Sequence, residues 1–233
     1  MWRFVAALSR EGKLWFSGRT GWAPVSICAG TKAVARARSA THHRRMRAPE
    51  EFETDRLRLR PVARADAADI FRTYAGQAGP MQFMNFPRHR DVAESVTFAD
   101  FCEACWRSGS AFPWAVTDRV TGQFMGALEL RLKPPRADLG YILGERFWGQ
   151  GFAGEAASAV VAWAIAQPGI FRVWATCHPE NVASAAVLRR AGLTYEATLA
   201  NWDARPQLGE AAGPNDCYAL TKSPGTEEIT PPP

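Results

Sequence analysis

Hydrophobic and polar residues alternate in the first patterned stretch of the chain, TDRLRLRPV (54–62). Leu57 and Leu59 are separated by arginines, which predicts a strand with one face in water. Helical spacing follows in ARADAADIFRTYAG (63–76) and returns over 91–107. The segment 75–90 holds Gly, Pro and Asn among aromatic residues, which predicts a loop between the two helices.

The hydrophobic period changes to two from residue 112. FPWAVTD and FMGALELRL flank the turn sequence RVTGQ, which predicts an antiparallel hairpin, and ADLGYIL (137–143) predicts a third strand. The remaining predicted elements are a helix to about 166, a strand at 171–177, a helix at 181–192 closed by Gly192, and strands at 195–200 and 216–222. This order predicts one mixed α+β domain over residues 54–222.

Composition and charge narrow the class of protein. The chain is 47% hydrophobic and 22% charged, as in globular proteins, and no apolar run reaches the roughly 18–20 residues of a membrane span. Its net charge is +5, but residues 1–47 carry ten Arg or Lys and one acid, whereas the remainder carries 18 basic and 22 acidic residues. Because the body is mildly acidic, we expect neither a nucleic-acid nor a membrane partner.

The basic segment 1–47 has three explanations. An Arg-rich, acid-poor leader fits a transit peptide, a basic tail for an acidic partner, or a reading frame upstream of a true start at Met46. It lacks a sustained apolar period, and the domain pattern begins soon after Met46, so the third explanation is favoured. We expect 1–47 to be a disordered or non-native leader and 223–233 a disordered tail.

The five cysteines give little sign of metal or redox chemistry. Cys102 and Cys105 form a C-x-x-C, but they lie in a predicted helix, and no second pair completes a zinc site. We therefore expect two neighbours on one helix face, reduced thiols, no metal and a cytoplasmic location.

A glycine-rich stretch, FWGQGFAGEA (147–156), precedes a helix predicted to begin at Gly154–Glu155. The first N–H groups of a helix lack partners, and the helix dipole places partial positive charge there. Gly149 and Gly151 leave the approach open, so the loop can direct several amides at a phosphate. The stretch lacks the Lys-Ser/Thr ending of a Walker loop and the strand-G-x-G-x-x-G spacing of a dinucleotide fold. A plain tight turn with a packing glycine is the alternative.

Two motifs, DLGYILGERFWGQGFAGEA and HPENVASAAVLRRAGL, together with the order of elements, resemble the GNAT superfamily of acetyl-CoA-dependent N-acetyltransferases. Within it they resemble the RimJ/RimL branch of ribosomal-protein Nα-acetyltransferases, over most of 54–222. The resemblance implies the acyl-CoA N-acyltransferase fold, a mixed central sheet flanked by helices, with strand 137–143 splayed from its parallel neighbour 171–177. It implies acetyl-CoA as co-substrate, bound by Tyr141, Ile142, Leu143, Trp148, Gly149, Gln150, Gly151, Phe152, Ala153, Gly154 and Asn181.

The resemblance also implies groups for proton transfer. Asp138 stands where the family places a carboxylate on the splayed strand, and Glu129 on the neighbouring strand is a second candidate. Leu188 occupies the position where many members have a general-acid tyrosine. The serine of the N-x-x-S element, here Ser184, is then expected to protonate the leaving thiolate.

The implied reaction is direct attack by a primary amine in a ternary complex. The acceptor is either a protein N-terminus or a small-molecule amine, and the protein is a monomer or homodimer. The alternative is a catalytically silent acyl-CoA-binding sensor with the same motifs. We expect acceptor recognition in 75–110 and in a loop at 197–214, where Trp202 walls the site, and a structural role for His178.

Overall fold

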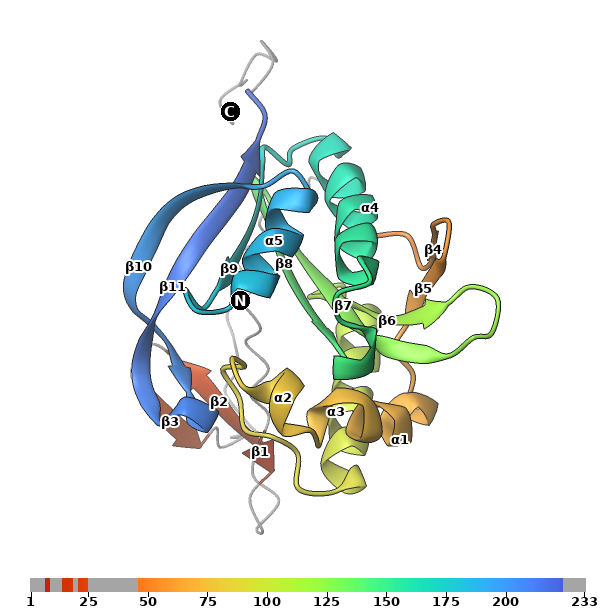
Figure 1. Ribbon diagram of the computed structural model, residues 1–233, viewed down its shortest axis with the longest axis vertical. Helices are drawn as coiled ribbons and strands as arrows, with labels where there is room; N and C mark the ends of the chain where they lie inside the picture. Colours follow the sequence, from red (N-terminus) through yellow and green to blue (C-terminus); the bar gives the residue numbers. More distant parts are fainter. Residues whose placement is uncertain (1–6, 9–13, 19–20, 25–45, 224–233) are drawn as a thin grey trace, which may run out of the picture. The chain divides into compact units, whose positions relative to one another are not determined.

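The computed structural model describes residues 7–8, 14–18, 21–24 and 46–223 (Figure 1). The chain divides into two units, and the smaller comprises Arg3–Arg47. Its described strands, β1 (Ala7–Leu8), β2 (Leu14–Gly18) and β3 (Gly21–Pro24), form an antiparallel sheet. That residues 1–47 are a disordered or non-native leader stays a prediction, and most of the predicted tail, residues 224–233, lies outside the described residues.

The larger unit is built on an eight-stranded sheet in the order β10-β11-β9-β8-β7-β6-β5-β4 (Figure 1). Its strands are β4 (Phe52–Glu53), β5 (Leu57–Pro61), β6 (Phe112–Asp118), β7 (Phe124–Lys133), β8 (Arg136–Leu143), β9 (Arg172–Cys177), β10 (Thr194–Arg205) and β11 (Glu210–Thr221). Leu57 and Leu59 are fully buried, as their alternation predicts.

Five α-helices are described in this unit: α1 (Ala67–Ile70), which continues into a π-helical turn (Phe71–Ala75), α2 (Ala78–Met81), α3 (Val92–Ser108), α4 (Phe152–Ala166) and α5 (Val182–Arg190). The ring of Trp106 on α3 meets Phe112 and Trp114 of β6 with centroids 5.0 and 5.4 Å away. Cys102 and Cys105 are buried free thiols on α3. The hydrophobic core on this side therefore joins α3 to β6.

The β8–β9 pair is the only parallel pair in the described sheets, and it is short. Its ladder runs from Arg136–Arg172 to Asp138–Trp174 and then stops. Beyond these pairs, the last residues of both strands line a common cavity. The predicted splayed pair, and with it the mixed α+β fold, is confirmed.

Three predicted boundaries were wrong. The segment 75–90 contains α2, and the glycine-rich helix begins at Phe152 because the first i→i−4 bond runs from Glu155 N to Gly151 O (3.0 Å). Most of 197–214 is not a loop but the two arms of the β10–β11 hairpin. The Gly, Pro and Asn residues of this segment interrupt the alternating pattern. The two strands still pair through several register shifts, which satisfies their backbone hydrogen bonds.

Candidate active site

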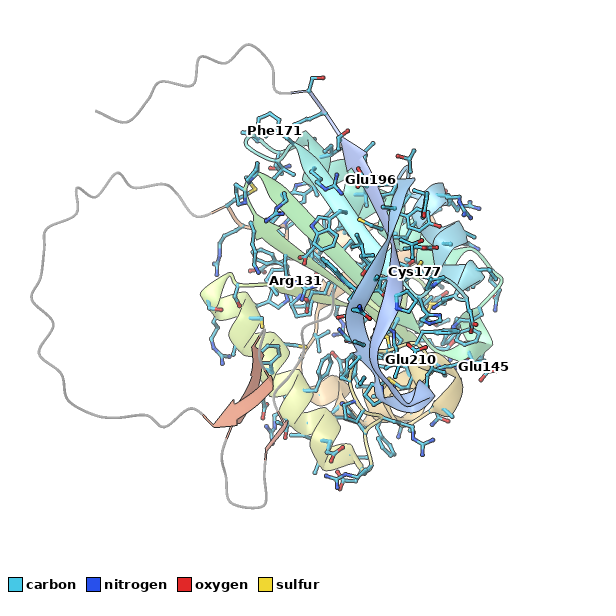
Figure 2. All side chains as sticks on the ribbon, turned by 90° about the vertical axis from the view of Figure 1, so that its left-hand side faces the viewer. Arg131, Glu145, Phe171, Cys177, Glu196 and Glu210 are labelled. Carbon is cyan, nitrogen blue, oxygen red and sulfur yellow. The ribbon has the colours of Figure 1, made fainter. Side chains whose placement is uncertain are left out.

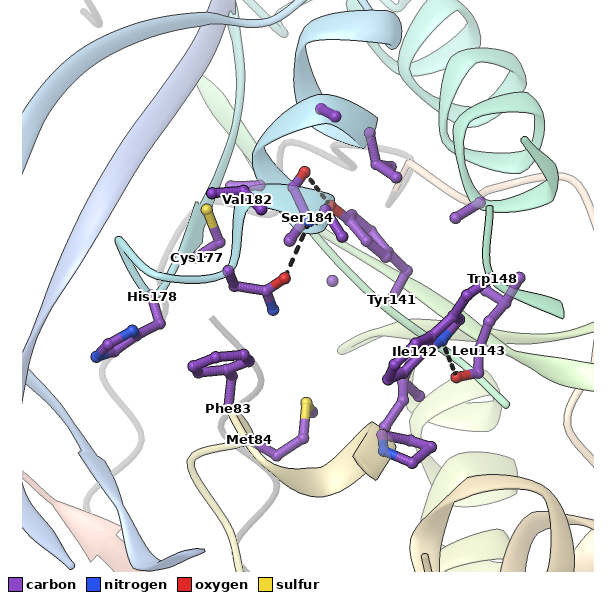
Figure 3. Close-up of a pocket in the computed structure, with 18 of the residues that line it drawn as sticks. Phe83, Met84, Tyr141, Ile142, Leu143, Trp148, Cys177, His178, Val182 and Ser184 are labelled. Carbon is purple, nitrogen blue, oxygen red and sulfur yellow. Dashed lines mark hydrogen bonds between the residues drawn. The ribbon is translucent and has the colours of Figure 1, made fainter. Parts of the chain in front are cut away.

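A cavity of about 570 Å³ opens between the splayed strands (Figure 3). Its walls come from the glycine-rich loop, the first turns of α4 and α5, the segment after α2, and the hairpin end of the sheet. Every residue predicted to bind the cofactor lines it except Gln150. The Gln150 side chain instead donates to the Arg146 carbonyl (2.8 Å).

The glycine-rich loop owes its course to two left-handed residues. Gly149 has φ +72° and Gly151 has φ +81°, conformations that side chains with a Cβ rarely adopt. Gly151 is the N-cap of α4, so the N–H groups of residues 152–154 have no partner within the helix. Residues 151–154 all line the cavity. The loop therefore offers unpaired amides and the positive end of the α4 dipole to a ligand.

Arg190 of α5 adds positive charge at the same place. It lines the cavity, and no carboxylate of the described residues forms an ion pair with it. A Cβ on Gly154 would lie 2.6 Å from its Cδ, so this glycine lets the arginine pack against the start of α4. Loop and arginine together form a site for an anion.

The splayed strand contributes backbone and one hydroxyl. From Leu139 to Leu143, β8 has no partner on the β9 side, where a ligand can pair with its backbone. The Leu143 carbonyl accepts from the Trp148 indole (2.9 Å; Figure 3). The Trp148 side chain is 48% exposed. The Tyr141 phenol reaches across the cavity wall to Ser184 (Figure 3).

Ser184 lies in the first turn of α5. Its N–H donates to the Asn181 carboxamide oxygen (3.0 Å), so Asn181 caps the helix. The Tyr141 hydroxyl lies 2.7 Å from Ser184 Oγ and donates to the Ser184 carbonyl (2.9 Å). Burial raises the pKa of Tyr141, so the phenol keeps its proton. Burial also raises the pKa of Cys177, beside Ser184, to about 11, so it is a thiol.

A buried polar cluster at the hairpin end was not anticipated. Asn215, fully buried, donates to Asp203 Oδ2 (2.9 Å) and Thr176 Oγ1 (3.0 Å) and accepts from Arg205. Burial lowers the pKa of Arg205, which is 2% exposed and whose Nε has no hydrogen-bond partner. Asp203 and Arg205 are two residues apart and so share one face of β10. That spacing in the sequence could have revealed the pair, but the surrounding Gly, Pro and Asn residues predict a loop instead of a strand.

Residues 56–194 match the family of acetyltransferase (GNAT) domains. The chain belongs to this family. It is 26% identical over 151 residues to the uncharacterized N-acetyltransferase YoaA of Bacillus subtilis (strain 168), covering 64% of this chain and 85% of that protein.

Two solved structures share the GNAT fold with this chain. The microcin C7 self-immunity acetyltransferase MccE, in complex with acetyl-CoA and AMP, has a TM-score of 0.65 at 19% identity, over 72% of this chain and 94% of that one. The ribosomal L7/L12 alpha-N-protein acetyltransferase RimL, in complex with coenzyme A, has a TM-score of 0.64 at 20% identity, over 72% and 95%. These likenesses confirm the predicted fold, and the match of residues 56–194 confirms the predicted GNAT family.

The two carboxylates expected from the GNAT resemblance are not among the residues that line the cavity. Asp138 accepts from Arg131 Nε (2.8 Å), and Glu129 Oε1 lies 3.4 Å from Arg131 Nη1. Burial raises the pKa of Glu129, which is 2% exposed, to about 7. Figure 2 shows Arg131 set apart from Cys177. The buried Arg131 thus pairs with two carboxylates that do not line the cavity.

His178 was expected to have a structural role, and Trp202 was expected to lie in a loop that walls the acceptor site. His178 is buried on the cavity wall, where its ring stacks on Phe83 at 5.1 Å and its Nε2 lies 3.5 Å from Glu210 Oε1. Trp202 lies on β10 and meets Trp174 edge to face at 6.5 Å. It does not line the cavity, so its predicted place as a wall of the acceptor site was wrong.

Two further properties of the described residues bear on chemistry. They contain no helix that is both long and apolar enough to cross a membrane. They also contain no group of three or more His, Cys, Asp or Glu side chains placed to hold a metal ion. The cavity itself offers backbone amides, hydroxyls, the carboxylates of Glu180 and Asp203, and the guanidinium groups of Arg190 and Arg205.

Proposed function

We propose that this GNAT protein transfers the acetyl group of acetyl-CoA to a primary amine by direct attack in a ternary complex. The observation that carries this is a single cavity that joins the amide-rich start of α4, the unpaired edge of β8 and Ser184. Two structural neighbours hold acetyl-CoA or coenzyme A, which supports the same ligand here.

The cavity suggests how acetyl-CoA lies. The diphosphate takes the amides of residues 151–154 and the Arg190 guanidinium, and the pantetheine arm pairs with the free edge of β8 near Ile142. The thioester carbonyl then lies near Ser184, between the diphosphate site and the polar cluster around Asp203. The amine enters from the polar cluster.

Transfer requires a neutral amine and a proton for the departing sulfur. The amine nitrogen attacks the thioester carbon, the C–S bond breaks, and the thiolate takes a proton or a strong hydrogen bond from Ser184 Oγ. The attacking nitrogen loses its proton to a carboxylate. Asp203 lines the cavity and takes it directly in this proposal, whereas Asp138 and Glu129 do not line the cavity and would need a water relay.

The test is an assay of CoA release with purified protein, acetyl-CoA and a panel of amines. The panel contains short peptides with free N-termini, amino acids, polyamines and aminoglycosides, and mass spectrometry identifies the acetylated product. We expect turnover with at least one class. If acetyl-CoA binds but no amine is acetylated above the uncatalysed rate, the protein is a silent acyl-CoA-binding module.

A further inference from the structure

Arg56, in the turn before β5, contacts the glycine-rich loop although the two lie 94 residues apart in the sequence. Its Nη1 donates to the Gln150 carbonyl (3.1 Å), and its Nε donates to Glu155 Oε2 (2.7 Å). Its guanidinium also lies over the Phe152 ring, 4.4 Å from the centroid. One side chain therefore contacts residues on both sides of the left-handed Gly151.

Glu155, in the first turn of α4, completes this contact. Its Oε1 accepts from the Arg56 backbone N–H (3.0 Å) and the Thr54 hydroxyl (2.5 Å). Burial of the carboxylate raises its pKa, but these hydrogen bonds and Arg56 outweigh burial and lower it overall, so Glu155 is ionised. Both carboxylate oxygens are thus held by the segment that leads into β5.

Exposed ion pairs usually contribute little, and Arg56 is 45% exposed. This contact differs because it combines a forked Arg–carboxylate pair with a carbonyl, a backbone amide and an aromatic ring. It also constrains a loop with glycines at 149 and 151, which is costly to order. Restraining such a loop before the ligand arrives lowers the entropic cost of binding.

We infer that Arg56 and Glu155 are positioning residues that hold the 150–155 turn in the geometry that receives the diphosphate of acetyl-CoA. This inference rests on the proposed placement of acetyl-CoA. Arg190 faces the ligand, whereas the Arg56 charge is balanced by Glu155 and acts on the loop. The pair therefore sets acetyl-CoA affinity through geometry rather than through net charge.

The sign of one substitution separates the two effects. If only charge mattered, Glu155→Gln would remove an anion near the diphosphate and tighten acetyl-CoA binding. Positioning predicts the opposite, because the amide cannot keep the ion pair with Arg56. We expect Glu155→Gln and Arg56→Gln each to raise the Kd for acetyl-CoA roughly tenfold, as for a lost charged hydrogen bond.

The chain supplies a matched control in Arg58 and Glu51. Arg58 is as exposed as Arg56 (46% and 45%), its Nη2 lies 2.7 Å from Glu51 Oε1, and Glu51 is more exposed than Glu155 (47% and 17%). Arg58→Gln and Glu51→Gln should leave the Kd within about twofold, as expected for an exposed pair. Arg56→Lys keeps the charge but not the fork, so its Kd should stay raised.

Two measurements on each full-length variant decide the question: calorimetry with acetyl-CoA, and hydrogen exchange without ligand at the amide of residue 155, which donates to the Gly151 carbonyl (3.0 Å). We expect faster exchange at this amide in both Arg56→Gln and Glu155→Gln, while the remaining sheet keeps its protection. Tighter binding in Glu155→Gln, wild-type affinity in Arg56→Lys, or equal affinities in Arg56→Gln and Arg58→Gln would each overturn the inference. Failure of the placement itself would appear separately, as unchanged affinity in Gly151→Asp.

Discussion

At the residue scale, Ser184 depends on a neighbour that reaches it from β8. The Tyr141 phenol donates to the Ser184 carbonyl (2.9 Å) and also lies 2.7 Å from Ser184 Oγ. Since burial raises the pKa of Tyr141, the phenol anchors the serine rather than supplying a proton itself. Tyr141 therefore contacts the Ser184 hydroxyl and carbonyl, while the Asn181 cap accepts from the Ser184 backbone N–H.

Ser184→Ala should lower kcat while leaving the Kd for acetyl-CoA nearly unchanged, because the hydroxyl matters as negative charge develops on sulfur. General acid catalysis contributes roughly 10²–10⁴-fold to the rate. A water molecule that takes the place of the missing hydroxyl reduces the loss of kcat toward the lower figure. Steady-state kinetics and calorimetry check this. Ser108→Ala, a helix serine on α3 whose hydroxyl bonds the Ala104 carbonyl, is the control. A kcat equal to that of the control would remove Ser184 from the mechanism.

Glu129 predicts a pH dependence of stability. Its pKa is raised by burial from 4.5 to about 7, so folding favours the protonated form. The stability it contributes is fully present below about pH 4.5 and is lost as the pH rises through about 7. Glu129→Gln keeps a neutral side chain, so its Tm relative to wild type should rise by roughly a few degrees between pH 5 and pH 8.

Thermal unfolding across this range measures the effect, with Glu53→Gln on exposed β4 as the control. The control should follow wild type at every pH. A constant difference between Glu129→Gln and wild type would mean that Glu129 stays ionised, balanced by Arg131 throughout.

At the element scale, the start of α4 combines backbone and charge in one feature. Gly151 turns the chain into the left-handed region, the helix begins at the next residue, and its first amides line the cavity. Arg56 and Arg190 flank this point, with guanidinium nitrogens 3.6 and 3.9 Å from where a Cβ of residue 151 would lie. A side chain at position 151 would be strained by the positive φ and would lie at the wall of the cavity.

Gly151→Asp should lower acetyl-CoA affinity by at least tenfold, because it adds a negative charge where the diphosphate is placed. Gly169→Asp is the matched control, since Gly169 has φ +75°, is exposed and lies outside the cavity. Both variants carry similar backbone strain, so the difference between them isolates the ligand. Calorimetry on folded protein measures it, and equal affinities would place the diphosphate elsewhere.

At the scale of the whole molecule, the cavity belongs to no single segment. Its lining comes from residues 79–85, 139–154, 175–190 and 203–215, brought together by the parallel pair β8–β9 and the long hairpin β10–β11. Gln207, between the hairpin arms, donates to the carbonyls of Met81 (2.6 Å) and Phe86 (3.0 Å). The hairpin therefore holds the segment after α2 against the polar end of the cavity.

The leader should be dispensable for this architecture. The cavity-lining residues and the eight-stranded sheet all lie beyond residue 47. A protein that starts at Met46 should keep the Tm and the acetyl-CoA affinity of the full chain, as thermal unfolding and calorimetry will measure. A fall of several degrees, about 1 kcal/mol or more for a domain of this size, would show that the leader stabilises the domain. Lost acceptor turnover with an intact fold would instead identify a basic arm that recruits its substrate.

The sequence by itself determined the features that are encoded locally. The alternation of Leu57 and Leu59, the glycines at 149 and 151, and the Asn181 cap each act through nearby backbone, so period and turn chemistry reveal them. Local pattern was therefore enough to place most of the strands and the glycine-rich loop along the chain, whereas the role expected of Ser184 came from the family resemblance.

Only the tertiary structure decided the polar end of the cavity. Asp203, Arg205 and Asn215 meet because β10 and β11 pair through several register shifts, which no local pattern specifies. Likewise, Asp138 occupies the expected strand position, yet its carboxylate accepts from Arg131 and does not line the cavity. Which buried charges pair depends on which strands meet and which faces become dry, because a buried charge must find a partner within reach.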